Sequence, residues 1–183
     1  MVTGGRKFLF IEGTLDTTNG DLRQGFNKLL AQELETQMPR IIMGGNTKAT
    51  LKKYRNPNLN CKNFALIDLD CMESEKPTVL ISHELNESDQ VYFMIQEMET
   101  WFLSQPSILD AFYGEQISHK IPKKDVKLIN SPDEFLQNLT KATRKGKYHK
   151  VNHGVALLNL LNAKTLINDF NDFSGLIENL KRA

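Results

Sequence analysis

The chain has 183 residues, which is enough for one well-buried core and short for two, so a single domain with a helical C-terminal extension is expected. A formal net charge of +1, with 25% charged and 40% hydrophobic residues, argues against a disordered tail and against an indiscriminate polyanion binder. The only apolar run near the N-terminus is residues 8–11, so the sequence predicts neither a signal peptide nor a membrane span.

The first half of the chain predicts strands and helices in alternation. Residues 7–12 (KFLFIE) form an apolar strand, residues 21–37 an amphipathic helix, and residues 39–45 (PRIIMGG) a second strand. A second helix fits residues 47–55, and residues 63–70 (NFALIDLD) form a third strand. This order is typical of a parallel, right-handed α/β sheet.

The two cysteines, Cys61 and Cys71, flank this third strand. Ten residues of extended chain span about 33 Å, so a disulfide between them would require the strand to be broken. No clustered Cys/His spacing typical of a zinc site occurs in the sequence. Reduced thiols and a cytoplasmic location are therefore expected.

The second half predicts one more strand and then mainly helices. Residues 71–89 are polar and predict a loop over the carboxyl edge of the sheet, with a length typical of a lid. A fourth strand is expected at residues 90–96. The helices expected after it lie at residues 97–105, 106–114, 153–161 and 173–181. A further helix is expected to begin at Pro132, with Ser131 as its N-cap and with Phe135 and Leu139 on its buried face.

Two apolar strands of the expected sheet end in carboxylates. Glu12, followed by Asp16, ends the first strand, and Asp68 and Asp70 end the third. The carboxyl ends of parallel strands open into one crevice, so these side chains are expected to converge. Two carboxylates about 4 Å apart repel by roughly 4 kcal/mol at an effective dielectric near 20, so the cluster needs a cation or raised pKa values. Mg2+ is the expected cofactor, with Mn2+ as the alternative.

Two further glutamates, Glu97 and Glu99, lie where the fourth strand gives way to a helix. They are either helix-start acids stabilised by the macrodipole or contributors to the metal shell. Glu99 is the better ligand candidate, because Met98, Trp101 and Phe102 are spaced to anchor its helix. An Asp-x-Asp pair is likewise typical of surface turns and helix caps, but the FALI run before it favours a ligand at a sheet edge.

Basic residues are concentrated in one stretch of the sequence. Residues 119–150 hold nine basic residues against three acidic ones, so this stretch is net +6 and the rest of the chain is net −5. The stretch is either a solvated surface or a phosphate-binding strip beside the acidic site. Within it Lys150 is suited to neutralise transition-state charge, and Tyr148 and His153 to position substrate or relay a proton. His153 is otherwise a polar residue ahead of a helix.

The FIEGTLD and ALIDLD segments resemble the two signature elements of the TOPRIM fold of topoisomerases, primases and OLD-type nucleases. More closely, the chain resembles a bacterial TOPRIM-like family of domains of unknown function, often encoded beside AAA/ABC-type ATPases in defence loci. The matching segments cover nearly the whole chain and include RQGFNKLL, MPRIIMGGNTKA, VYFMIQEMETWFLSQPSILDAFYG, IPKKDV and NLTKATRKGKYHKVNHGVALL. Cys71 and Met72 depart from the TOPRIM pattern, in which further acids often follow the Asp-x-Asp pair.

The resemblance implies one TOPRIM-like, Rossmann-like α/β domain over residues 1–183. About four mostly parallel strands form the central sheet, helices flank it, and residues 115–183 are a mainly helical, basic extension. It also implies acid/base work by Glu12, Mg2+ binding by the Asp-x-Asp pair and a role for Lys150 as basic partner. The candidate catalytic residues are thus Glu12 and Lys150, the candidate metal ligands Asp68, Asp70, Glu99 and Asp16, and the candidate substrate-binding residues Arg144, Lys147, Tyr148 and His153.

The function expected from these residues is a Mg2+-dependent nuclease or nuclease-like effector that hydrolyses DNA or RNA, in anti-phage defence with an ATPase partner. The alternative is a non-catalytic partner or regulatory subunit of an AAA/ABC-type ATPase, which would form its complex without Asp68 and Asp70. An enzyme acting on a small phosphorylated molecule is a third reading. No membrane association is expected.

Overall fold

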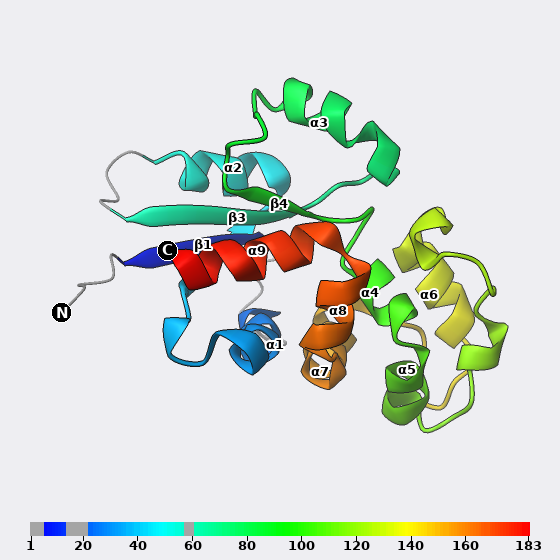
Figure 1. The fold of residues 1–183 in the computed structure, drawn as a ribbon. Coiled ribbons are helices and arrows are strands. Elements are labelled where there is room, and N and C mark those ends of the chain that lie inside the picture. Colours follow the sequence, from blue (N-terminus) through cyan, green and yellow to red (C-terminus); the bar gives the residue numbers. More distant parts are fainter. Residues whose placement is uncertain (1–5, 14–21, 57–60) are drawn as a thin grey trace.

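The computed structural model describes residues 6–13, 22–56 and 61–183, which fold around one parallel sheet (Figure 1). Its four strands are β1 (Lys7–Glu12), β2 (Arg40–Gly45), β3 (Lys62–Asp68) and β4 (Val91–Met94), in the order β2-β1-β3-β4. All three pairings are parallel, with Leu9 beside Phe64 and Ile67 beside Phe93. The α/β class predicted from the sequence, with about four mostly parallel strands, is confirmed.

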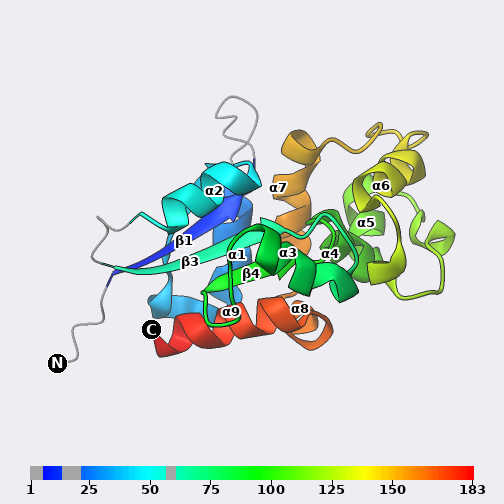
Figure 2. The same ribbon diagram turned by 90° about the horizontal axis from the view of Figure 1, so that it is seen from above.

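Helices cover both faces of the sheet. α2 packs against β1, β2 and β3 on one face, whereas α1 and α9 lie on the other (Figures 1 and 2). α4, α5 and α6 lie beyond the carboxyl ends of the strands. The helices are α1 (Leu22–Leu34), α2 (Thr47–Tyr54), α3 (Lys76–Ser82), α4 (Glu99–Ser104), α5 (Pro106–Tyr113), α6 (Pro132–Thr140), α7 (Lys150–Leu160), α8 (Ala163–Asp169) and α9 (Asn171–Arg182).

The apolar runs of the sequence form the two central strands. In β1 residues 8–11, and in β3 residues 64–67, every side chain is buried, as expected for strands covered on both faces. Beneath the sheet the single tryptophan, Trp101, meets Phe26 and Phe173 edge to face. These ring contacts fix the start of α4, and with it Glu99, against the core.

A glycine allows α1 and α7 to pack closely. A Cβ at Gly25 would lie 2.7 Å from the Cβ of Leu158 in α7, which is shorter than any normal carbon contact. Gly25 lowers the intrinsic helix propensity of α1, but it permits the close approach of the helix that carries Lys150.

Several local expectations need correction. The segment at residues 71–89 is not a continuous loop, because it contains a 3-10 turn (Glu73–Glu75) and α3. Lys76 anchors α3 through a 2.7 Å ion pair with Asp172 of α9, a contact that the local sequence does not reveal. Ser131 precedes α6, but its side chain makes no capping hydrogen bond. α8 was not expected; Asn162 caps it by accepting the Thr165 backbone N–H.

The C-terminal part from α6 onward is mainly helical, as predicted. α9 packs against β4 and α1, so the last helix contributes to the central core. None of the helices in the described ranges combines the length and apolarity that a membrane crossing requires.

Candidate functional site

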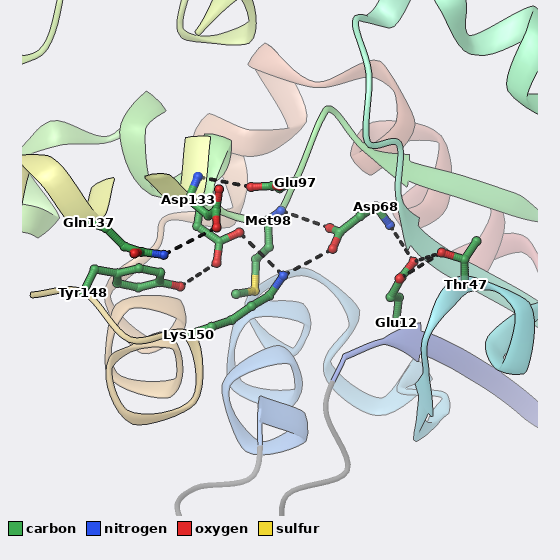
Figure 3. Close-up of polar contacts among 10 residues, drawn as sticks. Glu12, Thr47, Asp68, Glu97, Met98, Asp133, Gln137, Tyr148 and Lys150 are labelled. Carbon is green, nitrogen blue, oxygen red and sulfur yellow. Dashed lines mark hydrogen bonds and ion pairs between the residues drawn. The ribbon is translucent and has the colours of Figure 1, made fainter. Parts of the chain in front are cut away.

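Three carboxylates converge at the carboxyl edge of the sheet (Figure 3). Glu12 is the last residue of β1, Asp68 is the last residue of β3, and Glu99 opens α4 shortly after β4. The backbone N–H of Asp68 donates to Glu12 Oε2 at 3.1 Å, so the two strand ends are in direct contact. The predicted meeting of the β1 and β3 ends is therefore confirmed.

One ammonium group bridges two of these carboxylates. Lys150 Nζ lies 3.3 Å from Asp68 Oδ2 and 3.7 Å from Glu99 Oε2, and Figure 3 shows Lys150 reaching toward Asp68. Lys150 is the first residue of α7, which His149 caps by accepting the Asn152 backbone N–H. The surrounding carboxylates raise the pKa of Lys150 despite its partial burial, so it stays positively charged.

Asp68 is held in an environment that disfavours its charged form. Its Oδ1 accepts the backbone N–H of Met98 at 3.1 Å, and the residue is 9% exposed. Burial raises the pKa of Asp68 to about 8, and the nearby carboxylates, Glu99 first, add to this increase, whereas Lys150 opposes it. Burial is thus the main reason why the charged form of Asp68 is disfavoured, even though Lys150 lies beside it.

Glu99 is fully buried, and only one of its two carboxylate oxygens accepts a hydrogen bond from the described residues. Its Oε1 accepts the Tyr148 hydroxyl at 2.7 Å. Its Oε2 has no hydrogen-bond partner among the described residues, although Lys150 is near it. Burial, followed by the charge of Glu99, raises the pKa of Tyr148 well above its usual value, so Tyr148 stays a donor. A buried carboxylate oxygen without a hydrogen bond is costly, so the ammonium of Lys150 is the group that offsets the burial of Glu99 Oε2.

Glu12 is oriented by a residue that the sequence reading did not select. The Thr47 hydroxyl lies 2.9 Å from Glu12 Oε1 and 3.0 Å from Oε2, and it donates to this carboxylate. Thr47 opens α2 after Asn46, whose side chain accepts the Ala49 backbone N–H. Burial raises the pKa of Glu12, and hydrogen bonds partly oppose the rise. The N-cap pattern Asn-Thr at the end of β2 is the one sequence signal that marks Thr47.

A cavity of about 530 Å3 opens beside Glu99. Glu97 lies on its wall and accepts the Asp133 backbone N–H at the start of α6, at 3.1 Å. Burial and the charges of Glu99 and Asp133 raise the pKa of Glu97 to about 7. The lining residues are Glu97, Glu99, Asp133, Gln137, Lys147, Tyr148, His149, Lys150 and Val151.

The predicted metal ligands are only partly brought together. Asp70 lies past the end of β3 with a φ of 57° and is exposed, so the alternation expected for the Asp-x-Asp pair stops at Asp68. Asp16 lies outside the described residues. Among the residues that are described, no group of three or more His, Cys, Asp or Glu side chains is arranged to hold a metal. Asp68 and Glu99 remain as a pair, and Mg2+ commonly binds through one or two carboxylates and several waters.

The predicted substrate-binding residues divide into two sets. Arg144 and Lys147 are exposed. Tyr148 is 4% exposed, and its hydroxyl donates a hydrogen bond to Glu99. It therefore orients a carboxylate and does not face solvent. His153 Nδ1 lies 3.2 Å from the Tyr113 hydroxyl, and burial lowers the pKa of the imidazole. His153 is not among the residues that line the cavity beside Glu99.

Residues 20–181 match the family described as Domain of unknown function (DUF4276). Nothing among the curated proteins and nothing among the solved structures matches the chain. The matched range contains Asp68, Glu99 and Lys150, whereas Glu12 lies before it. The match therefore supports the relationship of this chain to the family and leaves the chemistry to be argued from the site.

Proposed function

We propose that this chain, which belongs to the DUF4276 family of domains of unknown function, is a Mg2+-dependent nuclease that hydrolyses phosphodiester bonds of DNA or RNA. One observation carries the proposal. A single ammonium, Lys150, faces the buried carboxylates Asp68 and Glu99 at the carboxyl edge of a parallel sheet. In open α/β sheets this edge is where ligands bind.

Burial of the carboxylates at this edge favours the binding of a further cation. Glu12, Asp68 and Glu97 all have pKa values raised chiefly by burial, so the fold holds these acids in an environment that opposes their ionisation. A divalent cation would reverse this effect, because attraction to it favours the charged carboxylates. Glu99 Oε2, which accepts no hydrogen bond from the described residues, and the carboxylate of Asp68 fit such an ion by donor type.

Each residue has a role in this proposal. Asp68 and Glu99 would hold Mg2+ or Mn2+, whose chemistry would be to lower the pKa of the attacking water and to neutralise phosphoryl charge. Glu12, fixed by Thr47, accepts the proton of that water as its oxygen attacks phosphorus and the P–O bond to the leaving oxygen breaks. Lys150 stabilises the negative charge that develops on the phosphoryl group, and the leaving oxygen takes its proton from solvent.

The relation to TOPRIM enzymes and the ATPase partner belong to the same proposal. The acid-tipped β1 and β3, with Glu12 and Asp68 in contact, support a TOPRIM-type arrangement. An AAA/ABC-type ATPase encoded nearby would then control the nuclease in anti-phage defence. A complex with the ATPase that forms equally well without Asp68, in the absence of any cleavage, would favour the non-catalytic alternative.

The test is cleavage of labelled single- and double-stranded DNA and RNA by purified protein, alone and with any AAA/ABC-type ATPase encoded beside it. Mg2+ and Mn2+ should support cutting and EDTA should abolish it. Asp68→Asn should lose at least about 100-fold in rate, since removing one essential stabilising group costs about that much. Glu87→Gln, at an exposed position outside the site, is the matched control and should cut like wild type. Absence of metal-dependent cutting in every arm would refute the nuclease assignment.

A further inference from the structure

The loop between α6 and α7, residues 141–149, carries several cations. We refer to it as the basic loop. Lys141, Arg144 and Lys147 are exposed, and none of their side chains forms an ion pair with any residue in the described ranges. A fourth cation, Lys145, is held against the ring of Phe112, 4.2 Å from its centroid. Three positive charges are thus left for a partner outside the protein.

The basic loop is held in one conformation by hydrogen bonds among its own residues. The Thr140 hydroxyl accepts the Tyr148 backbone N–H at 2.7 Å, which ties the two ends of the loop together. Thr143 and Gly146 are joined by backbone and side-chain hydrogen bonds across the turn, where Gly146 has a φ of 80°. Thr140, Thr143 and Tyr148 are buried while the cations point outward. A loop ordered before binding loses less entropy when it binds a ligand.

The basic loop leads directly into the carboxylate site. Lys147 and His149 line the same cavity of about 530 Å3 as Glu97 and Glu99. The next residue, Lys150, bridges Asp68 and Glu99. A polyanion lying along the loop would therefore have its backbone guided from an exposed positive rim to the recessed acids.

The acids lie too deep for an intact duplex. The side chain of Asp68 is 9% exposed and that of Glu99 is fully buried. Duplex DNA is stiff over about 50 nm, and bringing its backbone to acids buried to this extent would require it to kink or unpair. A single strand rotates freely about its backbone bonds and can place one nucleotide in a cavity of this size.

We infer that the substrate of this site is single-stranded or unpaired nucleic acid, bound through its phosphates by Lys141, Arg144 and Lys147 of the basic loop and threaded into the cavity beside Glu99. The inference rests on the proposed nuclease function for its biological meaning. Its physical content is a binding preference, which is measurable without cleavage.

The experiment is fluorescence anisotropy of a labelled oligothymidine and of a duplex of equal length, in EDTA, over a range of salt concentrations. The single strand should bind more tightly than the duplex. The triple variant Lys141→Gln, Arg144→Gln, Lys147→Gln should bind about 100-fold more weakly at about 0.1 M salt, because each lost phosphate contact removes about 0.7 from the slope of log K against log salt. The slope itself should become smaller by about 2.

The matched control removes three exposed lysines elsewhere, with Lys28→Gln, Lys52→Gln and Lys164→Gln in α1, α2 and α8. It should keep wild-type affinity, and thermal melting of both triple variants should show that they are folded. Duplex binding as tight as single-strand binding, or wild-type affinity in the basic-loop variant, would overturn the inference. The predicted binding pattern without metal-dependent cleavage would instead sustain the basic loop as a nucleic-acid surface and refute only the nuclease assignment.

Discussion

Replacing Asp68 with asparagine should make the metal-free protein more stable at neutral pH. The pKa of Asp68 is about 8 in the folded protein, against about 3.9 in an unfolded chain. Between these values the folded state keeps a proton that the unfolded state has released, so stability falls as pH rises from about 4 to 8. At pH 7 this loss spans about three pH units at about 1.4 kcal/mol each, which gives roughly 4 kcal/mol.

Asparagine avoids this loss because it carries no charge, and its carbonyl can still accept the Met98 N–H. It gives up the 3.3 Å contact with Lys150, which lowers the gain. We therefore expect Asp68→Asn to be about 2–4 kcal/mol more stable at pH 7, with the difference vanishing near pH 4. Urea unfolding at several pH values measures it, with the fluorescence of the buried single tryptophan, Trp101, as the signal.

Asp172→Asn is the control for a buried carboxylate outside the site. Asp172 bonds Lys76 at 2.7 and 2.8 Å, so its replacement should destabilise the protein by breaking a closely paired buried charge. An Asp68→Asn variant less stable than wild type at pH 7, or a stability difference that does not change with pH, would refute the electrostatic description of the site.

Three further predictions test the site and the core. Mg2+ at about 100 times its Kd should stabilise wild type by about 2.7 kcal/mol in a thermal-shift titration and leave Asp68→Asn unchanged; an equal response would remove Asp68 from the metal site. Tyr148→Phe should destabilise the protein by about 1–3 kcal/mol in urea, because Glu99 Oε1 loses its 2.7 Å donor. Gly44→Ala should cost about 1–3 kcal/mol in the same assay, since its Cβ would lie 2.0 Å from Thr50 Oγ1.

Local sequence patterns were sufficient to predict the elements whose burial follows directly from their composition. The KFLFIE run forms β1 with the predicted bounds, because an apolar run this short and this continuous fits a strand covered on both faces. α2 ends within one residue of its prediction, at Tyr54. The alternation of strands and helices then fixed the parallel sheet through the right-handed crossover rule.

Local patterns failed where distant contacts decide the structure. α3 shows no buried residue, and its Lys76 is held by Asp172, 96 positions away. Gly25 weakens its helix when read alone, but it is required by Leu158 of α7. Neither partner is visible within the window that sets helix or loop propensity.

The acids at the strand ends could be read from the sequence, but their chemical differences could not. The sequence by itself determined that Glu12 and Asp68 each end an apolar strand, because the period and length of the strands follow from hydrophobic patterning. That the two strands are neighbours was an expectation from the sequence, and the strand order of the folded sheet established it. Only the tertiary structure decided that Asp68 and Glu99 are buried around Lys150, that Asp70 is exposed, and that Thr47 and Tyr148 orient the carboxylates. Burial and charge proximity depend on residues brought together from the whole chain, and these two quantities set the pKa values on which the proposed chemistry depends.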